Sequence, residues 1–503
     1  VEFAATLLPD WGPLAVADIN RDGCIDILGA VGDCNGHFQG ASAYAIGLEA
    51  IFSSGRAYRD VRFADFNGDG ILDAVANTYT CDVAACGGNS SNSQLQLYFG
   101  NADGTFTQDL SFTGLSLPGG GFGETIVIAD FNNDGYLDIF LPKYTYYDPS
   151  EHNFLLINDG SGHFIDAADT AGVAMRNVPV CGRPEGAQAA DINNDGRIDL
   201  YAGSHLFLNN GNNADGIPVF ADLGPTIDVH CDVVTPSSAG LPAFFDEGAK
   251  FVDLDNSGQL SLALNGESTP PGIRVLKFDG IAHFSDADVI PPMFLSAAWG
   301  FNAADVDGDG LSDLVVAGGC DSGFFNGGEI DPDCTTFGNP HALPQLLVNR
   351  GGHFVLHDFF DDGLQPTGRG WHDLLTYADF DYSGTVDFIA RVAGGTNTGL
   401  YTVMNRAVSF DTLTVTVLGA NGEQNQAGRV VRVSPVLRPG VVMTQVVDGG
   451  SGYMSNGPYD LTFATPYEGA YTVTVRFAAG SYVTTAHAGD HVTMRANGTY
   501  SLE

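Results

Sequence analysis

The stretch ADFNNDGYLDIF, residues 129–140, places acidic and amide side chains at regular intervals ahead of a hydrophobic segment. Counted from its first aspartate, oxygen-bearing side chains stand at positions 1, 3, 5 and 9, and position 6 is glycine. Alternate residues can direct their oxygens at one point, the glycine permits a sharp turn, and position 7 can supply its carbonyl. This spacing predicts a loop that binds a hard cation, with Ca²⁺ the best fit.

The same pattern occurs seven times in the chain. Asp-Gly pairs are common in ordinary turns, but six of the seven copies keep an aspartate at position 9, beyond the turn, which favours cation binding. We number these segments loops 1 to 7 by their first aspartates, which lie 47 to 74 residues apart: Asp18, Asp65, Asp130, Asp191, Asp253, Asp305 and Asp379.

The predicted calcium ligands are the side chains at positions 1, 3, 5 and 9 and the residue at position 7. In the five intact loops they are Asp18, Asn20, Asp22, Cys24 and Asp26; Asp65, Asn67, Asp69, Ile71 and Asp73; Asp130, Asn132, Asp134, Tyr136 and Asp138; Asp191, Asn193, Asp195, Arg197 and Asp199; and Asp305, Asp307, Asp309, Leu311 and Asp313. In the two degenerate loops they are Asp253, Asp255 and Ser257, and Asp379, Asp381, Ser383, Thr385 and Asp387. We expect five to seven Ca²⁺ ions, because loop 5 has lost two carboxylates and loop 7 only one.

Internal repeats of this length are typical of a β-propeller or a solenoid. Each loop lies between two short apolar segments, and a third and fourth follow after most copies, as in residues 97–106, 155–164 and 346–354. Four antiparallel strands repeated seven times predict an all-β, seven-bladed propeller over residues 1–407, with a solenoid as the alternative. Residues 2–8 read like a fourth strand, so we expect them to close blade seven.

From residue 408 the repeat stops and alternating strands joined by glycine-rich turns begin. About 95 residues of this kind are enough for a small β-sandwich-like domain. We therefore predict a second domain over residues 408–503 that packs on the propeller.

The chain is strongly acidic, with a formal net charge of −41. Of its 61 acidic residues, 21 fall at the predicted ligand positions, so cation binding accounts for part of this charge. An anionic surface excludes nucleic acid as a partner and disfavours anionic membranes. No apolar segment reaches the ~18 residues of a membrane-spanning helix.

Eight cysteines, an even number, and a start at Val1 predict a secreted, disulfide-bonded chain whose signal peptide has been removed. The expected bridges are Cys81–Cys86, Cys181–Cys231 and Cys320–Cys334. Cys24 and Cys34 are left as the least secure pair, because a single extended strand between them would hold them about 25–30 Å apart.

The loops resemble FG-GAP/VCBS repeats, which form integrin-type propellers. The C-terminal part resembles an ASPIC/UnbV domain in residues 426–433, 450–456 and the strands ending near 491–495, but residues 477–481, FAAGS, depart from the Trp-Pro-Ser-Gly turn usual there. The resemblance implies an extracellular, calcium-bound and non-catalytic protein whose ligand is undefined.

Long segments on the face away from the calcium loops carry the best candidates for contact with a protein or glycan partner: Tyr144, Tyr146, Tyr147 and Trp371. Three functions stay open: a binding or scaffold module of the cell surface or matrix, a lectin, or a carbohydrate-active enzyme. The enzyme hypothesis rests on the dense polar stretch GRGWHD, residues 368–373. We predict no catalytic residues, because no G-x-S-x-G, H-E-x-x-H or P-loop motif occurs.

Overall fold

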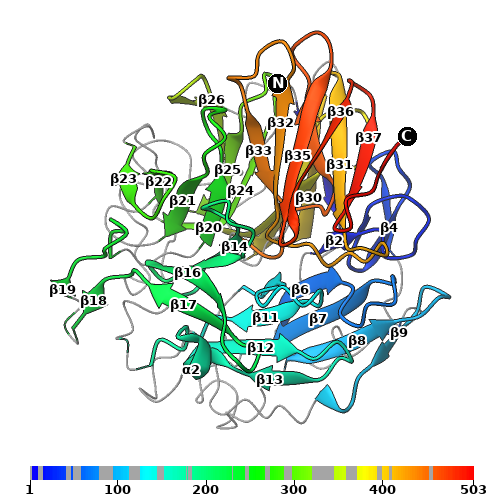
Figure 1. Cartoon of the computed structure of the whole chain (residues 1–503). Helices are drawn as coiled ribbons and strands as arrows, with labels where there is room; N and C mark the ends of the chain where they lie inside the picture. Colours follow the sequence, from blue (N-terminus) through cyan, green and yellow to red (C-terminus); the bar gives the residue numbers. More distant parts are fainter. Residues whose placement is uncertain are drawn as a thin grey trace.

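The computed structural model of the chain is built almost entirely of β-strands (Figure 1). The residues that it describes are 3–8, 15–40, 47–48, 58–78, 95–112, 125–143, 152–176, 178, 184–228, 230, 232–243, 248–266, 272–287, 297–319, 345–357, 371–393, 399–406, 410–451 and 457–503.

Seven four-stranded sheets, which we call blades 1 to 7, follow one another through the described part of residues 3–405. In each blade, loop n of the sequence joins the first strand to the second, and every strand pairs antiparallel with the next. The strands of blades 1 to 3 are β2 (Val16–Ala17), β3 (Asp26–Ile27), β4 (Ala30–Gly32) and β5 (Phe38–Gly40); β6 (Tyr58–Ala64), β7 (Asp73–Thr78), β8 (Gln96–Gly100) and β9 (Phe106–Gln108); and β10 (Val127–Ala129), β11 (Asp138–Leu141), β12 (Phe154–Asn158) and β13 (Phe164–Asp166).

Blades 4 to 7 repeat the arrangement. Their strands are β14 (Ala187–Ala190), β15 (Asp199–Ala202), β16 (His205–Asn212) and β17 (Pro218–Asp222); β20 (Gly248–Val252), β21 (Ser261–Gly266), β22 (Gly272–Phe278) and β23 (Phe284–Asp286); β24 (Ala297–Ala304), β25 (Asp313–Gly319), β26 (Gln345–Asn349) and β27 (Phe354–His357); and β28 (Trp371–Ala378), β29 (Asp387–Ala393), β30 (Gly399–Asn405) and β1 (Phe3–Leu8). A short helix, α2 (Ala168–Ala171), follows β13, and a hairpin of β18 (Thr226–Ile227) and β19 (Val233–Thr235) lies outside the blades.

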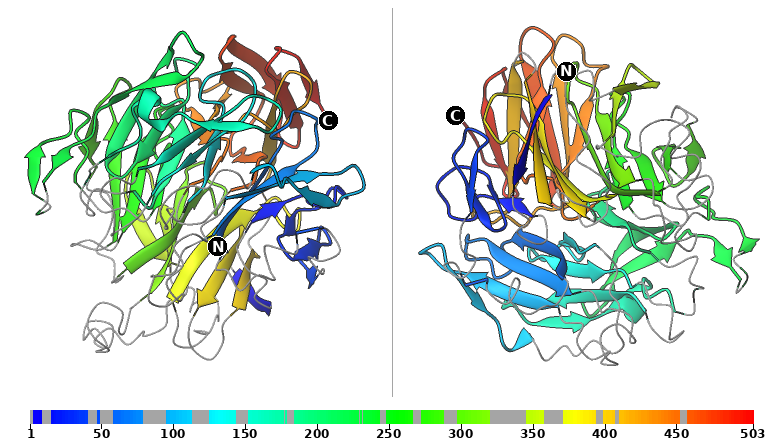
Figure 2. Two further views of the ribbon diagram at one scale, coloured as in Figure 1. Left: turned by 90° about the horizontal axis from the view of Figure 1, so that it is seen from below. Right: turned by 180° about the vertical axis from the view of Figure 1, so that it is seen from behind.

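The N-terminal strand β1 completes blade 7. It pairs antiparallel with β30, with Phe3 opposite Asn405 and Leu8 opposite Leu400. Figure 2 shows this blue strand lying beside the yellow strands of blade 7. The last blade of the ring is therefore made from both ends of the propeller sequence.

Hydrophobic cores fill the spaces between successive blades and run all the way round. Between blades 3 and 4, for example, Phe140 packs with Leu200. A core also joins the last blade to the first, since Ile27 of blade 1 packs with Ile389 of blade 7. Both faces of most strands are thus covered, which is why β11 and β20 are buried at every position. The prediction of an all-β propeller fold is confirmed.

The described part of residues 410–503 forms two further four-stranded sheets, seen in orange and red in Figure 1. A separate core that includes Val415, Val433 and Val473 lies between them, and β35 alternates buried and half-buried residues along its length. One sheet is mixed, because β31 and β37 run parallel. The sheets contain β34 (Leu461–Ala464), β31 (Thr412–Leu418), β37 (His491–Arg495) and β38 (Tyr500–Leu502), and β33 (Met443–Val446), β32 (Val430–Pro435), β35 (Tyr471–Phe477) and β36 (Gly480–Ala486).

The segment after β33 inserts among the innermost strands of the propeller. The amide of Ile128 in β10 donates to the carbonyl of Gly449 (2.7 Å). The buried Lys250 in β20 pairs with the buried Asp448 (2.9 Å) and donates to the Ser451 hydroxyl (2.9 Å). A Cβ at Gly449 would lie 2.0 Å from the Ile128 oxygen, so only glycine permits this approach. The C-terminal domain is thus anchored inside the ring.

The structure decides the pairing of Cys24 with Cys34, which the sequence left open. Cys24 and Cys34 form a disulfide with their Cα atoms 5.0 Å apart. The long separation would apply only to a single extended strand, and here Ile27 pairs with Ala30 and the chain reverses between them. The other six cysteines, at 81, 86, 181, 231, 320 and 334, lie outside the described residues. The described residues contain no helix long and apolar enough to cross a membrane.

Candidate metal centres

The seven loops share one backbone frame. The N–H of the position-6 glycine donates to the position-1 aspartate in every loop, at 2.8–3.0 Å. Position 6 has φ between 80° and 95°, as the sequence pattern requires of a glycine there. Position 4 is also left-handed in all seven loops, with φ between 52° and 75°, and this was not predicted because it holds Arg21, Asn or Tyr382 as well as glycine.

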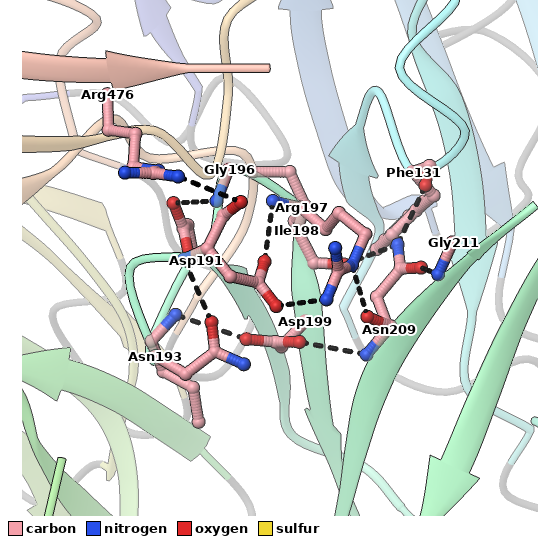
Figure 3. Close-up of polar contacts among 12 residues, drawn as sticks. Phe131, Asp191, Asn193, Gly196, Arg197, Ile198, Asp199, Asn209, Gly211 and Arg476 are labelled. Carbon is pink, nitrogen blue, oxygen red and sulfur yellow. Dashed lines mark hydrogen bonds and ion pairs between the residues drawn. The ribbon is translucent and has the colours of Figure 1, made fainter. Parts of the chain in front are cut away.

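Further backbone amides point at the oxygens of the loop. In loop 4 the Asp195 amide donates to both Asp191 Oδ1 (2.8 Å) and Asn193 Oδ1 (3.0 Å), and the Arg197 amide donates to Asp195 Oδ1 (2.9 Å). Figure 3 shows Asp191, Asn193 and Arg197 of this loop. These bonds turn the side chains of positions 1, 3 and 5 toward the inside of the loop. Each carboxylate oxygen retains a second lone pair for a cation.

The position-9 aspartates have a structural role of their own. In six loops one carboxylate oxygen accepts the amide of position 2, and the other accepts an amide from the third strand. Asp138, for example, is fully buried between Phe131 N (3.0 Å) and Asn158 N (2.9 Å). Retention of an acid at position 9 therefore has a folding reason that sequence analysis did not recognise.

Burial makes these carboxylates poor anions on their own. Burial, together with the neighbouring acids of the same loop, raises the pKa of Asp73 to about 7 and those of Asp313 and Asp387 to about 8. A buried charge without a counter-charge is costly. A bound cation would offset this cost, so the electrostatics of the loops fit a metal.

Carboxylates converge most closely in loops 6 and 7. Oxygens from positions 1, 3 and 9 lie within 4.8 Å of one another in each loop, from Asp305, Asp307 and Asp313 and from Asp379, Asp381 and Asp387. Asp307 Oδ1 is buried and has no hydrogen-bond partner among the described residues. Such an orphaned oxygen is what a hard cation would coordinate. In loops 1 to 4 position 3 is asparagine, which offers an amide oxygen instead.

Basic side chains lie against the three loops that have aspartate at position 3. Lys277 pairs with Asp255 of loop 5 (2.9 Å), Arg350 with Asp307 of loop 6 (2.5 Å), and Arg406 with Asp381 of loop 7 (3.7 Å). In loop 5 this leaves one net negative charge, because positions 5 and 9 are serine. Loop 5 is therefore the least acidic of the seven.

Asparagines at the ends of third strands tie neighbouring loops together, a feature missed in the sequence. Asn158 Nδ2 donates to the carbonyl of Phe66 in loop 2 (2.8 Å) and of Leu137 in loop 3 (3.1 Å). The equivalent Asn209, which Figure 3 shows, bridges loops 3 and 4. Asn349 and Asn405 reach loops 5 and 6 in the same way. The phrases LLIN, LFLN and LLVN carry the signal, but only the fold reveals the acceptors.

The predicted partner-binding aromatics cannot be placed by this geometry. Tyr144, Tyr146 and Tyr147 lie outside the described residues. Trp371 opens β28, and only its backbone is described.

Comparison with known proteins shows which repeat family part of the chain is similar to. A family model for the FG-GAP-like repeat matches residues 80–141, which include loop 3. Residues 80–141 are thus similar to an FG-GAP-like repeat, and the same oxygen-lined loop recurs in all seven blades. The chain is related to cartilage acidic protein: "Cartilage acidic protein 1" of Xenopus tropicalis is 25% identical over 338 residues, which cover 61% of this chain and 48% of that protein. The chain thus matches less than half of the length of this curated relative.

Two solved structures match most of the chain at low similarity. The major Malassezia sympodialis allergen Mala s 1 has a TM-score of 0.32 and 11% identity, and the match covers 69% of this chain and 92% of that chain. The Bombyx mori GH32 β-fructofuranosidase BmSUC1 has a TM-score of 0.29 and 9% identity, covering 88% of each chain. Scores this low carry no argument about fold or function.

Proposed function

We propose that this chain is a secreted, calcium-stabilised, non-catalytic binding or scaffold protein of the cell surface or extracellular matrix. The observation that carries the proposal is the repeated loop frame, with converging carboxylates in loops 6 and 7. Calcium accepts six to eight oxygens in irregular geometry, which suits side chains of mixed type. The ion would be held by positions 1, 3, 5 and 9 and the carbonyl of position 7, and it would supply positive charge to the buried acids.

Similarity to FG-GAP repeats and to cartilage acidic protein supports an extracellular placement. Repetition of the same site around the ring favours a structural role for the cation, since a catalytic site is usually unique. The C-terminal domain contacts the calcium-loop side of the propeller. We therefore place the partner on the opposite face, with Tyr144, Tyr146, Tyr147 and Trp371 as anchors.

Thermal unfolding in calcium and in chelator tests the cation. At free calcium about tenfold above each dissociation constant, each site adds roughly 1.4 kcal/mol and six sites about 8 kcal/mol. This is comparable to the whole stability of a typical domain, about 5–15 kcal/mol. We expect chelation to lower the Tm by on the order of 10–20 °C. A shift of only a few degrees, equal to that seen on removing Mg²⁺, would refute a stabilising role for calcium.

Binding to a glycan array and to matrix proteins, in calcium, tests the partner face. Alanine at the three tyrosines should weaken binding and leave the calcium-dependent Tm unchanged. Binding that survives these changes but is lost with changes in residues 408–503 would contradict the placement. Turnover of a polysaccharide by the purified chain would contradict the non-catalytic assignment.

A further inference from the structure

The C-terminal domain makes the same hydrogen bond to three successive calcium loops. In three consecutive loops the carbonyl of the position-6 glycine accepts a hydrogen bond from a C-terminal side chain. The donors are Asn425 to Gly135 of loop 3 (2.5 Å), Arg429 to Gly196 of loop 4 (2.9 Å) and Arg432 to Gly258 of loop 5 (3.3 Å). The domain therefore contacts the same backbone carbonyl in three repeats.

The two arginines also reach position 4 of the loop before. Arg429 donates to Asn133 Oδ1 of loop 3 (2.7 Å), and Arg432 donates to Asn194 Oδ1 of loop 4 (3.0 Å). Each guanidinium thus bridges two neighbouring loops. Positions 4 and 6 are the two left-handed residues of the frame. These contacts consequently require the folded conformation of the loop and not merely its sequence.

Main-chain bonds extend the contact. The Asp191 amide, at position 1 of loop 4, donates to the Gly428 carbonyl (3.1 Å), and the Val442 amide donates to the Asn256 carbonyl of loop 5 (2.8 Å). Coverage of the loops is unequal. The position-6 glycines of loops 4, 5 and 6 are buried, whereas Gly23 of loop 1 and Gly70 of loop 2 are exposed.

Loop 1 is held by other means. Its position-7 residue, Cys24, is in the disulfide with Cys34, and the Tyr382 hydroxyl of loop 7 donates to the Gly23 carbonyl (2.8 Å). In the described part of the chain, the hydrogen bonds of loop 1 come from the loop itself, from Gly32 and Cys34, and from Tyr382, and not from residues 410–503. Loop 1 therefore serves as a control for loop 4, since it has the same frame but no hydrogen bond to the described residues of the C-terminal domain.

We propose that the calcium-loop face is the docking surface of the C-terminal domain, and that cation binding in loops 3 and 4 and docking strengthen each other. The proposal rests on the calcium binding proposed above. A cation inside the loop holds positions 4 and 6, whose outer oxygens the domain contacts. Loops 3 and 4 each carry three carboxylates, but in loop 4 Arg197 pairs with Asp195, so a bound divalent ion leaves one negative charge on loop 3 and none on loop 4. Arg429, buried between the two loops, therefore still meets the net negative charge of loop 3 when both loops are filled.

Two glycines of the C-terminal domain provide a matched pair for the first experiment. An alanine Cβ at Gly449 would meet the Ile128 carbonyl of the propeller, whereas one at Gly440 meets nothing within 4 Å. Neither substitution changes charge, and neither residue has a positive φ. Gly449→Ala in the full chain should undock the domain, and Gly440→Ala should not.

Hydrogen exchange during a calcium titration reads both events in one sample. The amide of Ile128 reports docking, and the position-6 amides of Gly196 and Gly23 report loops 4 and 1. We expect Gly449→Ala to deprotect Ile128 and to raise the calcium midpoint of Gly196 at least about fivefold, with Gly23 unchanged, since coupling is reciprocal. Deprotection of Ile128 with both midpoints within about twofold of wild type would overturn the proposal.

If the Gly449→Ala variant stays docked, the reciprocal experiment tests the coupling by weakening a calcium loop and measuring docking. Asp195→Asn and Asp22→Asn remove the same charge at position 5 of loops 4 and 1, and both keep the Oδ1 acceptor. At a calcium concentration that saturates the wild type, Asp195→Asn should deprotect Ile128 and Asp22→Asn should not. Equal protection of Ile128 in both variants and wild type would overturn the coupling. Absence of any calcium effect on Gly196 and Gly23 in wild type would instead refute the proposed calcium binding.

Discussion

Replacing Asn158 tests whether the loops are joined into one unit. The side chain is buried and makes three hydrogen bonds: to the carbonyls of Phe66 and Leu137, and from the amide of Gly160 (2.9 Å). Asn158→Ala removes all three and leaves buried polar groups unpaired. At about 0.5–1.5 kcal/mol for each bond, plus the cost of the unpaired groups, we expect a loss of about 2–4 kcal/mol in the free energy of unfolding.

Urea unfolding in saturating calcium, followed by tryptophan fluorescence, measures this loss. Asn158→Asp should be destabilised to a similar extent, because it keeps the shape but cannot donate. Asn101→Ala is the matched control: Asn101 lies at the turn after the third strand of blade 2, and its side chain donates to Thr105 of that turn and Thr107 of β9, within the same blade. Its cost should stay below about 1 kcal/mol. If Asn158→Ala unfolds within about 0.5 kcal/mol of wild type, the bridge does not join the loops.

Three further outcomes follow from the loops and from β1. In chelator, stability should rise as the pH falls from 8 to 5.5, because the folded state holds protons on Asp313 and Asp387 that the unfolded state has released. The calcium-loaded protein should lose stability over the same pH range. Tm values that fall together with and without calcium would contradict this prediction. Arg350→Met should raise the calcium affinity of loop 6, because the guanidinium competes with the ion for Asp307, and the gain should be at most about fivefold because that guanidinium is half-exposed. Arg274→Met, whose partner Asp286 lies outside the loops, should leave calcium titrations unchanged. Deleting residues 1–8 should expose the edge of β30 and promote self-association in sedimentation, and an equally stable monomer would count against the pairing of β1.

The features that could be predicted from sequence are those written within a few adjacent residues. The spacing of acids in each loop, the glycine at position 6 and the four apolar segments per repeat are local, and they were enough for the propeller fold. The role of Asn158 could not be predicted because its acceptor, the carbonyl of Phe66, is 92 residues away in the sequence. The Cys24–Cys34 pair could not be decided because the reversal at Ile27–Ala30 spans only two residues and has no strong turn sequence beyond Gly29.

The position of the C-terminal domain could not be predicted for a related reason. Arg429 and Arg432 lie in an ordinary alternating segment, and nothing nearby in the sequence marks the oxygens that they contact in loops 3 to 5. Long-range polar contacts depend on two surfaces that form independently. A single sequence shows each surface, but it does not show that they meet.

The pairing of β1 with β30 also bears on how the protein is made. On a ribosome that adds about 5–20 residues per second, roughly 20–80 s separate the synthesis of the two strands. Until then Phe3–Leu8 has no partner and the ring stays open at one seam. Each blade can fold as it emerges, because its four strands are close in sequence, but the unpaired edges at the seam invite association with other nascent chains. The nascent protein therefore needs protection at these two edges, by a chaperone or by rapid closure, until residues 399–405 have left the ribosome.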